Sequence, residues 1–263
     1  MKIMKTRRFE AGAALVLLAA AAACADNTGR LSFSVASGTG SAPAGSVVSP
    51  VIAANLQASC ATGQAQIVLG TDQICVTRVD LVLRKIELKR LEVTACDAVP
   101  DNDDCEEFES GPILATLPPF GVTQVTVKDA PNGTYDKFEF EIHKPDPSND
   151  GLFIGTLPQG FPSGVSIRVQ GFYNANAQPF DFQSDLDVGM EVTLNTPLTV
   201  SGGTANVDLQ IDLSGWFKNG AGTGLVDPAS ANKGGANESV VANNIQNSFK
   251  AFEDDNKDGL ADH

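Results

Sequence analysis

The clearest pattern along this chain is a period-two alternation of apolar and polar residues between Val122 and Ile142. Its second half, KFEFEI (137–142), places every apolar side chain on one face of an extended strand. The two halves meet at Pro131-Asn132-Gly133, where proline presets φ for a turn and Asn-Gly accepts positive φ. The pattern predicts a β-hairpin with one dry and one solvated face.

A second long strand is predicted from Ile74 to Ala95. Its apolar side chains share one face as far as Leu83, and the phase then shifts by one residue across Arg84-Lys85, which indicates a β-bulge. Two interpretations of its basic residues remain open: a docking surface for an anionic partner, or a solvated face paired with acidic neighbours, which is favoured. These basic residues are Arg78, Arg84, Lys85, Lys89 and Arg90.

Shorter alternating runs at 31–35, 165–172, 188–194, 198–200 and 207–213 are separated by Asn, Gly and Pro. Strands at this spacing, without helical periods between them, predict an all-β protein built as an antiparallel β-sandwich or barrel. Trp216-Phe217 is expected to close the end of the core; the alternative is an aromatic platform for a sugar.

One helix is predicted near the C-terminus. Val241, Ile245, Phe249 and Phe252 recur at helical spacing within ESVVANNIQNSFKAFE (238–253). This spacing predicts one C-terminal amphipathic helix of about four turns that docks its apolar stripe on the body.

The N-terminus has the form of a secretory signal. Four basic residues precede an apolar run at 11–23 that is too short to span a bilayer, and Cys24 follows. Ala21-Ala22-Ala23-Cys24 resembles the lipobox of bacterial lipoproteins, which implies that Cys24 carries the lipid and anchors the protein to a membrane of the bacterial envelope, at the outer membrane or cell surface. The alternative is ordinary cleavage with a free cysteine.

The number of cysteines supports the lipid anchor. Of the five cysteines, four remain when Cys24 is set aside, and an even number in an exported chain suits two disulfides. The pairs nearest in sequence are Cys60–Cys75 and Cys96–Cys105, out of three possible connectivities. No CxxC pair occurs and His143 and His263 are the only histidines, which argues against a thiolate zinc site.

Net charge excludes some partners. The chain carries −14, of which the export segment contributes +3 (four basic residues less Glu10), so the mature chain carries −17. This charge repels nucleic acid and anionic membrane surfaces. The acidic stretch 97–107 is either a hard-cation site or, as favoured here, a solubilising loop.

The predicted organisation has four parts. Residues 1–23 are a signal peptide and 24–30 a tether for the lipid anchor. Residues 31–217 form the β-sandwich domain, with a flexible insertion at 37–65. Residues 218–263 form a Gly/Asn-rich linker, the helix and an acidic loop.

The order of these features resembles an uncharacterised family of bacterial and archaeal envelope lipoproteins, domain of unknown function 4382. The resemblance covers residues 29–143 and rests on LSFSV (31–35), RVDLVLRKIEL (78–88) and above all the corner Pro131-Asn132-Gly133-Thr134-Tyr135. It implies a β-sandwich of the immunoglobulin-like or transthyretin-like kind and no known activity.

The last residues resemble the first nine positions of an EF-hand-type calcium loop. This resemblance implies a calcium site in which side chains and one carbonyl share the ion, with affinity in the range of about 10⁻⁴ to 10⁻³ M because the bidentate Glu of position twelve is missing. The alternative is a solvated acidic terminus. The implied ligands are Asp254, Asn256 and Asp258, the Leu260 carbonyl, and Asp262 directly or through water. A weaker echo at 146–151 is interpreted as a loop.

The residues favour a non-catalytic binding or adhesion module whose partner is a glycan or an envelope protein. No Gly-x-Ser-x-Gly elbow occurs, histidines are few, and the cysteines are assigned to disulfides, so catalytic triads are disfavoured. The alternatives are a structural or assembly component of the envelope and a glycan-processing enzyme that works with carboxylates alone.

Overall fold

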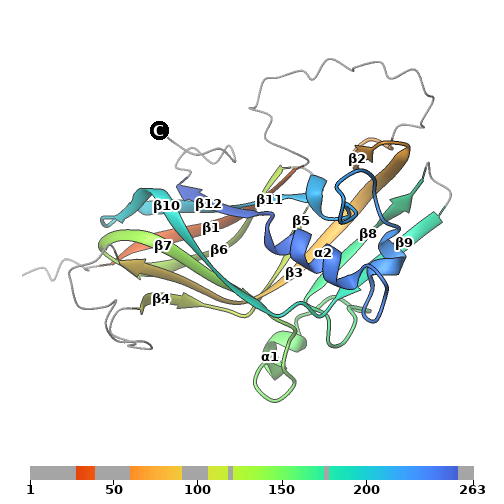
Figure 1. Cartoon of the computed structure of the whole chain (residues 1–263). Helices are drawn as coiled ribbons and strands as arrows, with labels where there is room; N and C mark the ends of the chain where they lie inside the picture. Colours follow the sequence, from red (N-terminus) through yellow and green to blue (C-terminus); the bar gives the residue numbers. More distant parts are fainter. Residues whose placement is uncertain (1–27, 39–59, 91–105, 118–120, 175–177, 254–263) are drawn as a thin grey trace, which may run out of the picture.

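The computed structural model describes residues 28–38, 60–90, 106–117, 121–174 and 178–253, and most of them lie in two β-sheets (Figure 1). The helical segments are α1 (Gly151–Ile154), η2 (Leu213–Gly215), η3 (Pro228–Ala231) and α2 (Glu238–Gln246). The strands are β1 (Thr28–Gly38), β2 (Ala65–Leu69), β3 (Asp72–Arg90), β4 (Glu106–Ser110), β5 (Ile113–Leu117), β6 (Gly121–Pro131), β7 (Gly133–Ile142), β8 (Ile167–Tyr173), β9 (Gln178–Ser184), β10 (Val188–Val200), β11 (Thr204–Asp212) and β12 (Phe249–Glu253).

The smaller sheet has the order β12-β11-β1-β6. Strand β1 runs antiparallel to β6 but parallel to β11, so this sheet is mixed rather than purely antiparallel as the sequence predicted. Parallel neighbours need a long connection between them, and here the chain forms the whole larger sheet before β11 returns beside β1.

The larger sheet is organised around β3, which spans roughly 60 Å at about 3.3 Å per residue. The first half of β3 pairs with β2 and β8, its middle with β5, and its second half with β4 and β7; β9 and β10 complete the sheet. The pairing with β7 shifts register between Leu83 and Lys85, which confirms the predicted bulge. Two halves of one strand therefore join two groups of partners.

The predicted hairpin at 122–142 is wrong, although both of its strands exist. Strand β6 pairs with β1 in the smaller sheet, while β7 pairs with β3 and β10 in the larger one. Asn132 alone separates the two strands, so Pro131-Asn132-Gly133 makes a corner between sheets. Pro131-Asn132-Gly133 can form either a hairpin turn or a corner between sheets. The strands with which β6 and β7 pair decide which of the two forms. Buried Tyr135 donates its hydroxyl hydrogen to the Pro131 carbonyl over 2.8 Å and braces the corner.

We expect Tyr135→Phe to lower the free energy of unfolding by about 1–2 kcal/mol, because it removes a buried hydrogen bond and leaves the Pro131 carbonyl without that donor. Tyr173→Phe is the matched control, since the Tyr173 hydroxyl is half-buried and lies a long 3.5 Å from its acceptor, the Leu225 carbonyl. Urea unfolding measures both variants, and equal effects would contradict a bracing role for Tyr135.

Both sheets contribute to one apolar core. Phe33 on β1 stacks on Phe138 of β7 with ring centroids 5.3 Å apart, and Phe138 contacts Phe140 at 5.7 Å. Phe140 in turn meets Phe249 of β12 at 5.4 Å. The predicted dry face of β7 is confirmed, because Phe138, Phe140 and Ile142 are all at most 2% exposed.

The predicted four-turn helix at the C-terminus is only half right. Helix α2 ends at Gln246, with Val241 and Ile245 buried as expected, but the chain then forms β12 at the edge of the smaller sheet (Figure 1). Asn247 and Ser248 follow the helix directly, and such residues favour helix ends because their side chains compete for backbone hydrogen bonds. The segment after 217 is therefore part of the sheet as well as a linker and helix.

Trp216 closes the core as predicted. It is 1% exposed, and its indole Nε1 donates to Ser248 Oγ over 2.8 Å. Phe217 beside it packs edge-on against Phe180 and Phe182 of β9. A ring buried in this way offers no face to a sugar, so the alternative of a sugar platform at Trp216 is wrong.

Within the residues that the structure describes, no helix has the length and apolar character to cross a membrane.

Candidate functional site

The larger sheet turns a polar surface away from the core, which we call the charged face. It comprises alternate residues of three adjacent strands, β3, β7 and β10, because directly opposed residues share a face. The register aligns these residues in three rows: Lys85–Glu141–Gly189, Glu87–Glu139–Glu191 and Lys89–Lys137–Thr193.

On this face each charged side chain of one sign lies near one of the opposite sign. The middle row opposes three glutamates, which alone would be destabilising. A lysine of a neighbouring row offsets each of them: Lys85 pairs with Glu87, Lys89 with Glu139, and Lys137 with Glu191 at 3.5 Å. Arg84 likewise lies 3.9 Å from Glu141. The basic band of β3 is thus a face paired with acidic neighbours, as the favoured interpretation predicted.

The charged face is hollowed by a shallow depression of about 430 Å³. Its lining consists of lysines and glutamates of the three strands together with Phe140 and Met190, whose side chains pack in the core. The side chains of Lys89, Lys137 and Glu191 are 32%, 31% and 46% exposed, so a partner can reach them. Rigid strands, charge and concavity therefore combine on this face.

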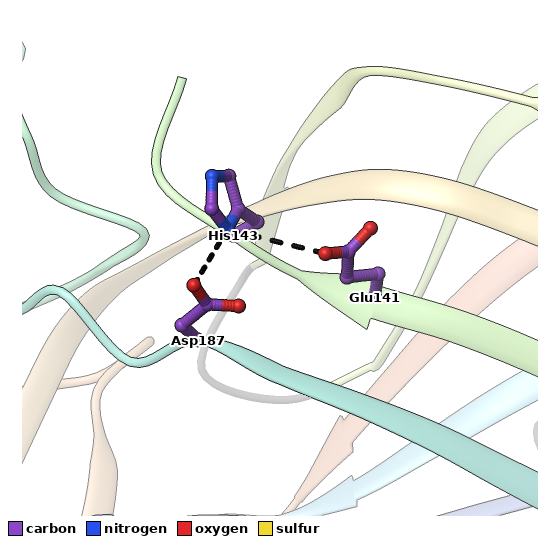
Figure 2. Close-up of side chains that lie close together, drawn as sticks. All are labelled: Glu141, His143 and Asp187. Atoms are coloured by element: carbon purple, nitrogen blue, oxygen red, sulfur yellow. Dashed lines mark ion pairs between the residues drawn. The ribbon is translucent and has the colours of Figure 1, made fainter. Parts of the chain in front are cut away.

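At one end of this face, Glu141, His143 and Asp187 converge (Figure 2). His143 Nδ1 lies 3.0 Å from Asp187 Oδ2 and 3.9 Å from Glu141 Oε1. Side chains two residues apart along a strand share a side, so Glu141 near the end of β7 and His143 just after it lie on the same side. Val188 pairs with Ile142, which places Asp187, one residue before β10, opposite His143. The backbone register therefore builds the cluster.

The three side chains differ in exposure: 16% for His143, 31% for Glu141 and 59% for Asp187. The His143 backbone N–H donates to the Val82 carbonyl over 3.4 Å and ties the residue to β3. Among the described residues, this cluster brings three His, Cys, Asp or Glu ligand atoms within 4.8 Å of one another. The sequence does not reveal the cluster, because the Glu-x-His spacing is readable but the register that brings in Asp187 is not.

A second polar network, on the β8 side of the same sheet, is structural. Asp80 is fully buried and accepts hydrogen bonds from Arg78 Nε at 3.0 and 2.8 Å and from Thr116 Oγ1 at 2.7 Å. Arg168 donates to both oxygens of Asp181, and these hydrogen bonds hold the pKa of Asp181 below its ordinary value. Every carboxylate oxygen of Asp80 and Asp181 thus accepts a hydrogen bond from a neighbouring side chain, which supports a structural role for this network.

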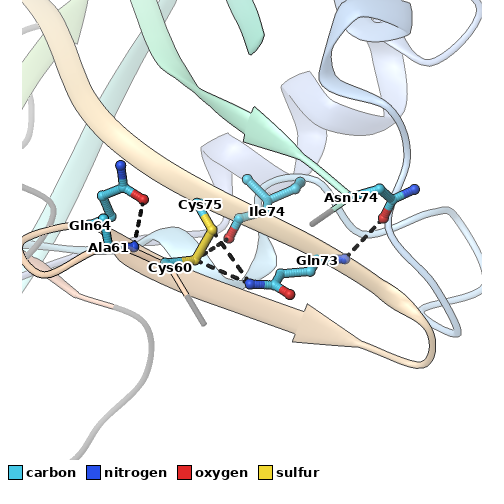
Figure 3. The surroundings of a disulfide bond; sticks show 7 residues. All are labelled: Cys60, Ala61, Gln64, Gln73, Ile74, Cys75 and Asn174. Carbon is cyan, nitrogen blue, oxygen red and sulfur yellow. Dashed lines mark hydrogen bonds between the residues drawn. A yellow bond between two sulfur atoms is a disulfide. The ribbon is translucent and has the colours of Figure 1, made fainter. Parts of the chain in front are cut away.

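Cys60 and Cys75, the first pair suggested by the sequence, are joined by a disulfide with Cα atoms 5.5 Å apart (Figure 3). Gln73 Nε2 lies beside both sulfurs, and the Gln73 backbone N–H donates to Asn174 Oδ1. The disulfide thus fastens the residues before β2 to the start of β3. Cys24, Cys96 and Cys105 lie outside the described residues.

We expect the double variant Cys60→Ser/Cys75→Ser to lose about 3 kcal/mol of stability, the chain-entropy value for a loop of 15 residues. Denaturant unfolding checks this. Reductant is the control: it should destabilise the wild type by a similar amount, and any further effect on the double variant reports a second disulfide. A double variant as stable as the wild type would contradict the expectation.

The calcium-type loop also lies outside the described residues, with Asp254, Asn256, Asp258, Leu260 and Asp262. Its occupancy stays a prediction. The weaker echo at 146–151 is a loop as interpreted, in which Asp146 accepts hydrogen bonds from the Ser148 backbone and hydroxyl and from Asn149. The Ser148 backbone bond contributes most to lowering the pKa of Asp146.

Comparison of the chain with protein-family models, with curated proteins and with solved structures gave no match.

Proposed function

We propose that this protein is an exported, lipid-anchored component of the bacterial envelope that binds a partner without catalysing a reaction, and that the charged face is its docking surface. The observation that carries the proposal is the ordered array of lysines and glutamates on β3, β7 and β10, hollowed by a depression. The sequence supports export and anchoring through the signal segment and Cys24.

The arrangement of carboxylates favours binding over glycan hydrolysis. A glycosidase needs two carboxylates that face each other across a cleft that holds the sugar. Glu87, Glu139 and Glu191 instead lie in one row along a sheet, and each is paired with a lysine. Glu87 is buried, but the pairs of Glu139 and Glu191 are partly exposed, and such pairs contribute little to stability, so they exchange partners at low cost.

The chemistry of the charged face selects a polypeptide partner. Alternating lysine and glutamate side chains complement a surface that carries both signs, as protein surfaces do, and such patterns set specificity and association rate. Sugars are held mostly by exposed aromatic rings beside hydrogen-bonding groups, whereas Trp216 and Tyr135 are buried here. An envelope protein is therefore the partner we propose, and a glycan is an outcome that the test distinguishes.

We further propose that the two sheets form a sandwich of the immunoglobulin-like kind. Support comes from the Tyr135 corner, because a tyrosine near a strand start that bonds backbone a few residues upstream at an inter-sheet corner is a hallmark of such sandwiches. The shared core between the sheets also supports it.

The docking proposal is tested with isolated envelopes and the protein purified without its lipid. We expect saturable binding that weakens as salt rises, falls at least tenfold in Glu191→Lys, and disappears when the envelopes are treated with protease. Lys128→Glu is the matched control, because Lys128 is an exposed charge on β6 in the other sheet. Binding that survives protease but is lost after glycan digestion would overturn the polypeptide partner, and binding indifferent to Glu191→Lys would overturn the charged face.

A further inference from the structure

We propose that Glu141, His143 and Asp187 bind a divalent transition-metal ion of the zinc class at the end of the charged face. This inference is independent of the docking proposal, because it rests on the contacts of His143 with Asp187 and Glu141 and on a different chemistry. It also differs from the calcium expectation for residues 254–262.

The ligand set selects the metal. Imidazole nitrogen suits zinc, copper, nickel and iron, whereas calcium and magnesium prefer shells made of oxygen alone. One imidazole and two carboxylates offer three protein ligands, and a zinc site with three protein ligands leaves a fourth position for water or a partner's side chain. The two carboxylates also balance the double charge of the ion.

The distances are close to those of a loaded site. With zinc–ligand bonds of about 2.0–2.2 Å, two ligands of one tetrahedral zinc lie about 3.3–3.5 Å apart. The His143–Asp187 and His143–Glu141 separations of 3.0 and 3.9 Å lie on either side of that value. Small side-chain rotations are enough, and the half-exposed Asp187 is free to make them.

An independent observation points to a missing partner of His143. Its Nδ1 atom is buried and has no hydrogen bond, even though Asp187 Oδ2 is only 3.0 Å away. The ring nitrogen is therefore not directed along the line to that oxygen. A cation bonded to both atoms would also lie off this line, because each bond of about 2.0–2.2 Å is longer than half of the 3.0 Å separation.

The surroundings leave room for the ion. Gly189 stands opposite Glu141 on β10, and a Cβ added there would meet nothing within 4 Å. Of the basic neighbours, Arg84 lies 3.9 Å from Glu141 Oε1 and Lys85 is paired with Glu87. Arg84 competes with the ion for Glu141, so we expect an affinity in the micromolar range rather than that of a closed structural site.

A metal here would tie the end of β7 to the start of β10. His143 begins the loop that leads to α1, and Asp187 lies between β9 and β10. Binding to the folded protein alone raises its melting temperature in proportion to the logarithm of metal concentration. Metal binding and thermal stability are thus two readouts of one site.

The test is calorimetric titration of the chelator-treated, detergent-purified full protein with ZnCl₂, followed by thermal melts. We expect the wild type to bind one equivalent more than both His143→Ala and Asp187→Asn, and zinc to raise its melting temperature more than theirs. Glu191→Gln is the matched control, a carboxylate on the same face outside the cluster, and it should bind as the wild type does.

Differences between variants cancel any zinc held by cysteines or by the acidic C-terminus. Asp187→Asn changes a half-exposed side chain and keeps its shape, so it tests the site even if His143→Ala unfolds the protein. Millimolar calcium should leave the zinc isotherm of this site unchanged. Retention of the full zinc stoichiometry in either variant, or its loss in Glu191→Gln, would overturn the proposal.

Discussion

We expect Phe138→Ala to lower the free energy of unfolding by about 3–5 kcal/mol, the usual cost of truncating a buried phenylalanine. Phe138 is fully buried and touches both sheets, since it stacks on Phe33 of β1 and contacts Phe140 on its own strand. Its loss would open a cavity between the two close-packed sheets, where the Phe138 ring fills the space between β1 and β7. Urea unfolding followed by fluorescence of the single tryptophan measures the effect.

Val68→Ala is the control for Phe138→Ala, because Val68 is an apolar strand residue that is 49% exposed. Its truncation should cost less than about 1 kcal/mol. Similar costs for the two variants would mean that the Phe33–Phe138 contact does not join the sheets.

The second large effect concerns the anchor. We expect Cys24→Ser to move the protein from the membrane fraction to the soluble fraction, because two acyl chains are needed for stable anchoring and the serine cannot receive them through a thioether. Detergent phase partitioning of cell fractions gives the readout, and mass spectrometry of the wild-type N-terminus shows the modification. A wild-type mature N-terminus away from Cys24, or a variant that stays in the membrane, would contradict the lipid anchor.

Strand faces were predictable from this sequence, because the burial of one face directly causes the alternation. The bulge at Arg84-Lys85 and the dry face of β7 both followed from the phase of apolar residues. Strand β9 was missed: Phe180 and Phe182 alternate, but Pro179 argues against a strand, and the structure resolves this by placing β9 at a sheet edge, where proline is tolerated.

Strand partners were not predictable, because they depend on residues far away in the sequence. Pro131-Asn132-Gly133 specifies a reversal of the chain, but whether β6 folds onto β7 or onto β1 is decided by the whole sheet. The same limit hid the cluster of Glu141, His143 and Asp187. Glu141 and His143 share a face by period two, whereas Asp187 joins them only through the β7–β10 register. The C-terminal helix was predicted too long for a related reason, since Phe249 lies on β12 and contacts Phe140, a partner that its own sequence neighbourhood does not reveal.

The most direct test of the docking proposal exchanges one ion pair on the charged face. Lys137→Glu combined with Glu191→Lys keeps the pair, its partly exposed setting and the net charge of the chain, but it inverts the local pattern. We predict that stability stays within about 0.5 kcal/mol of the wild type, while binding to isolated envelopes falls at least tenfold. Wild-type binding by the stable exchanged variant would contradict the assignment of this face as the docking surface.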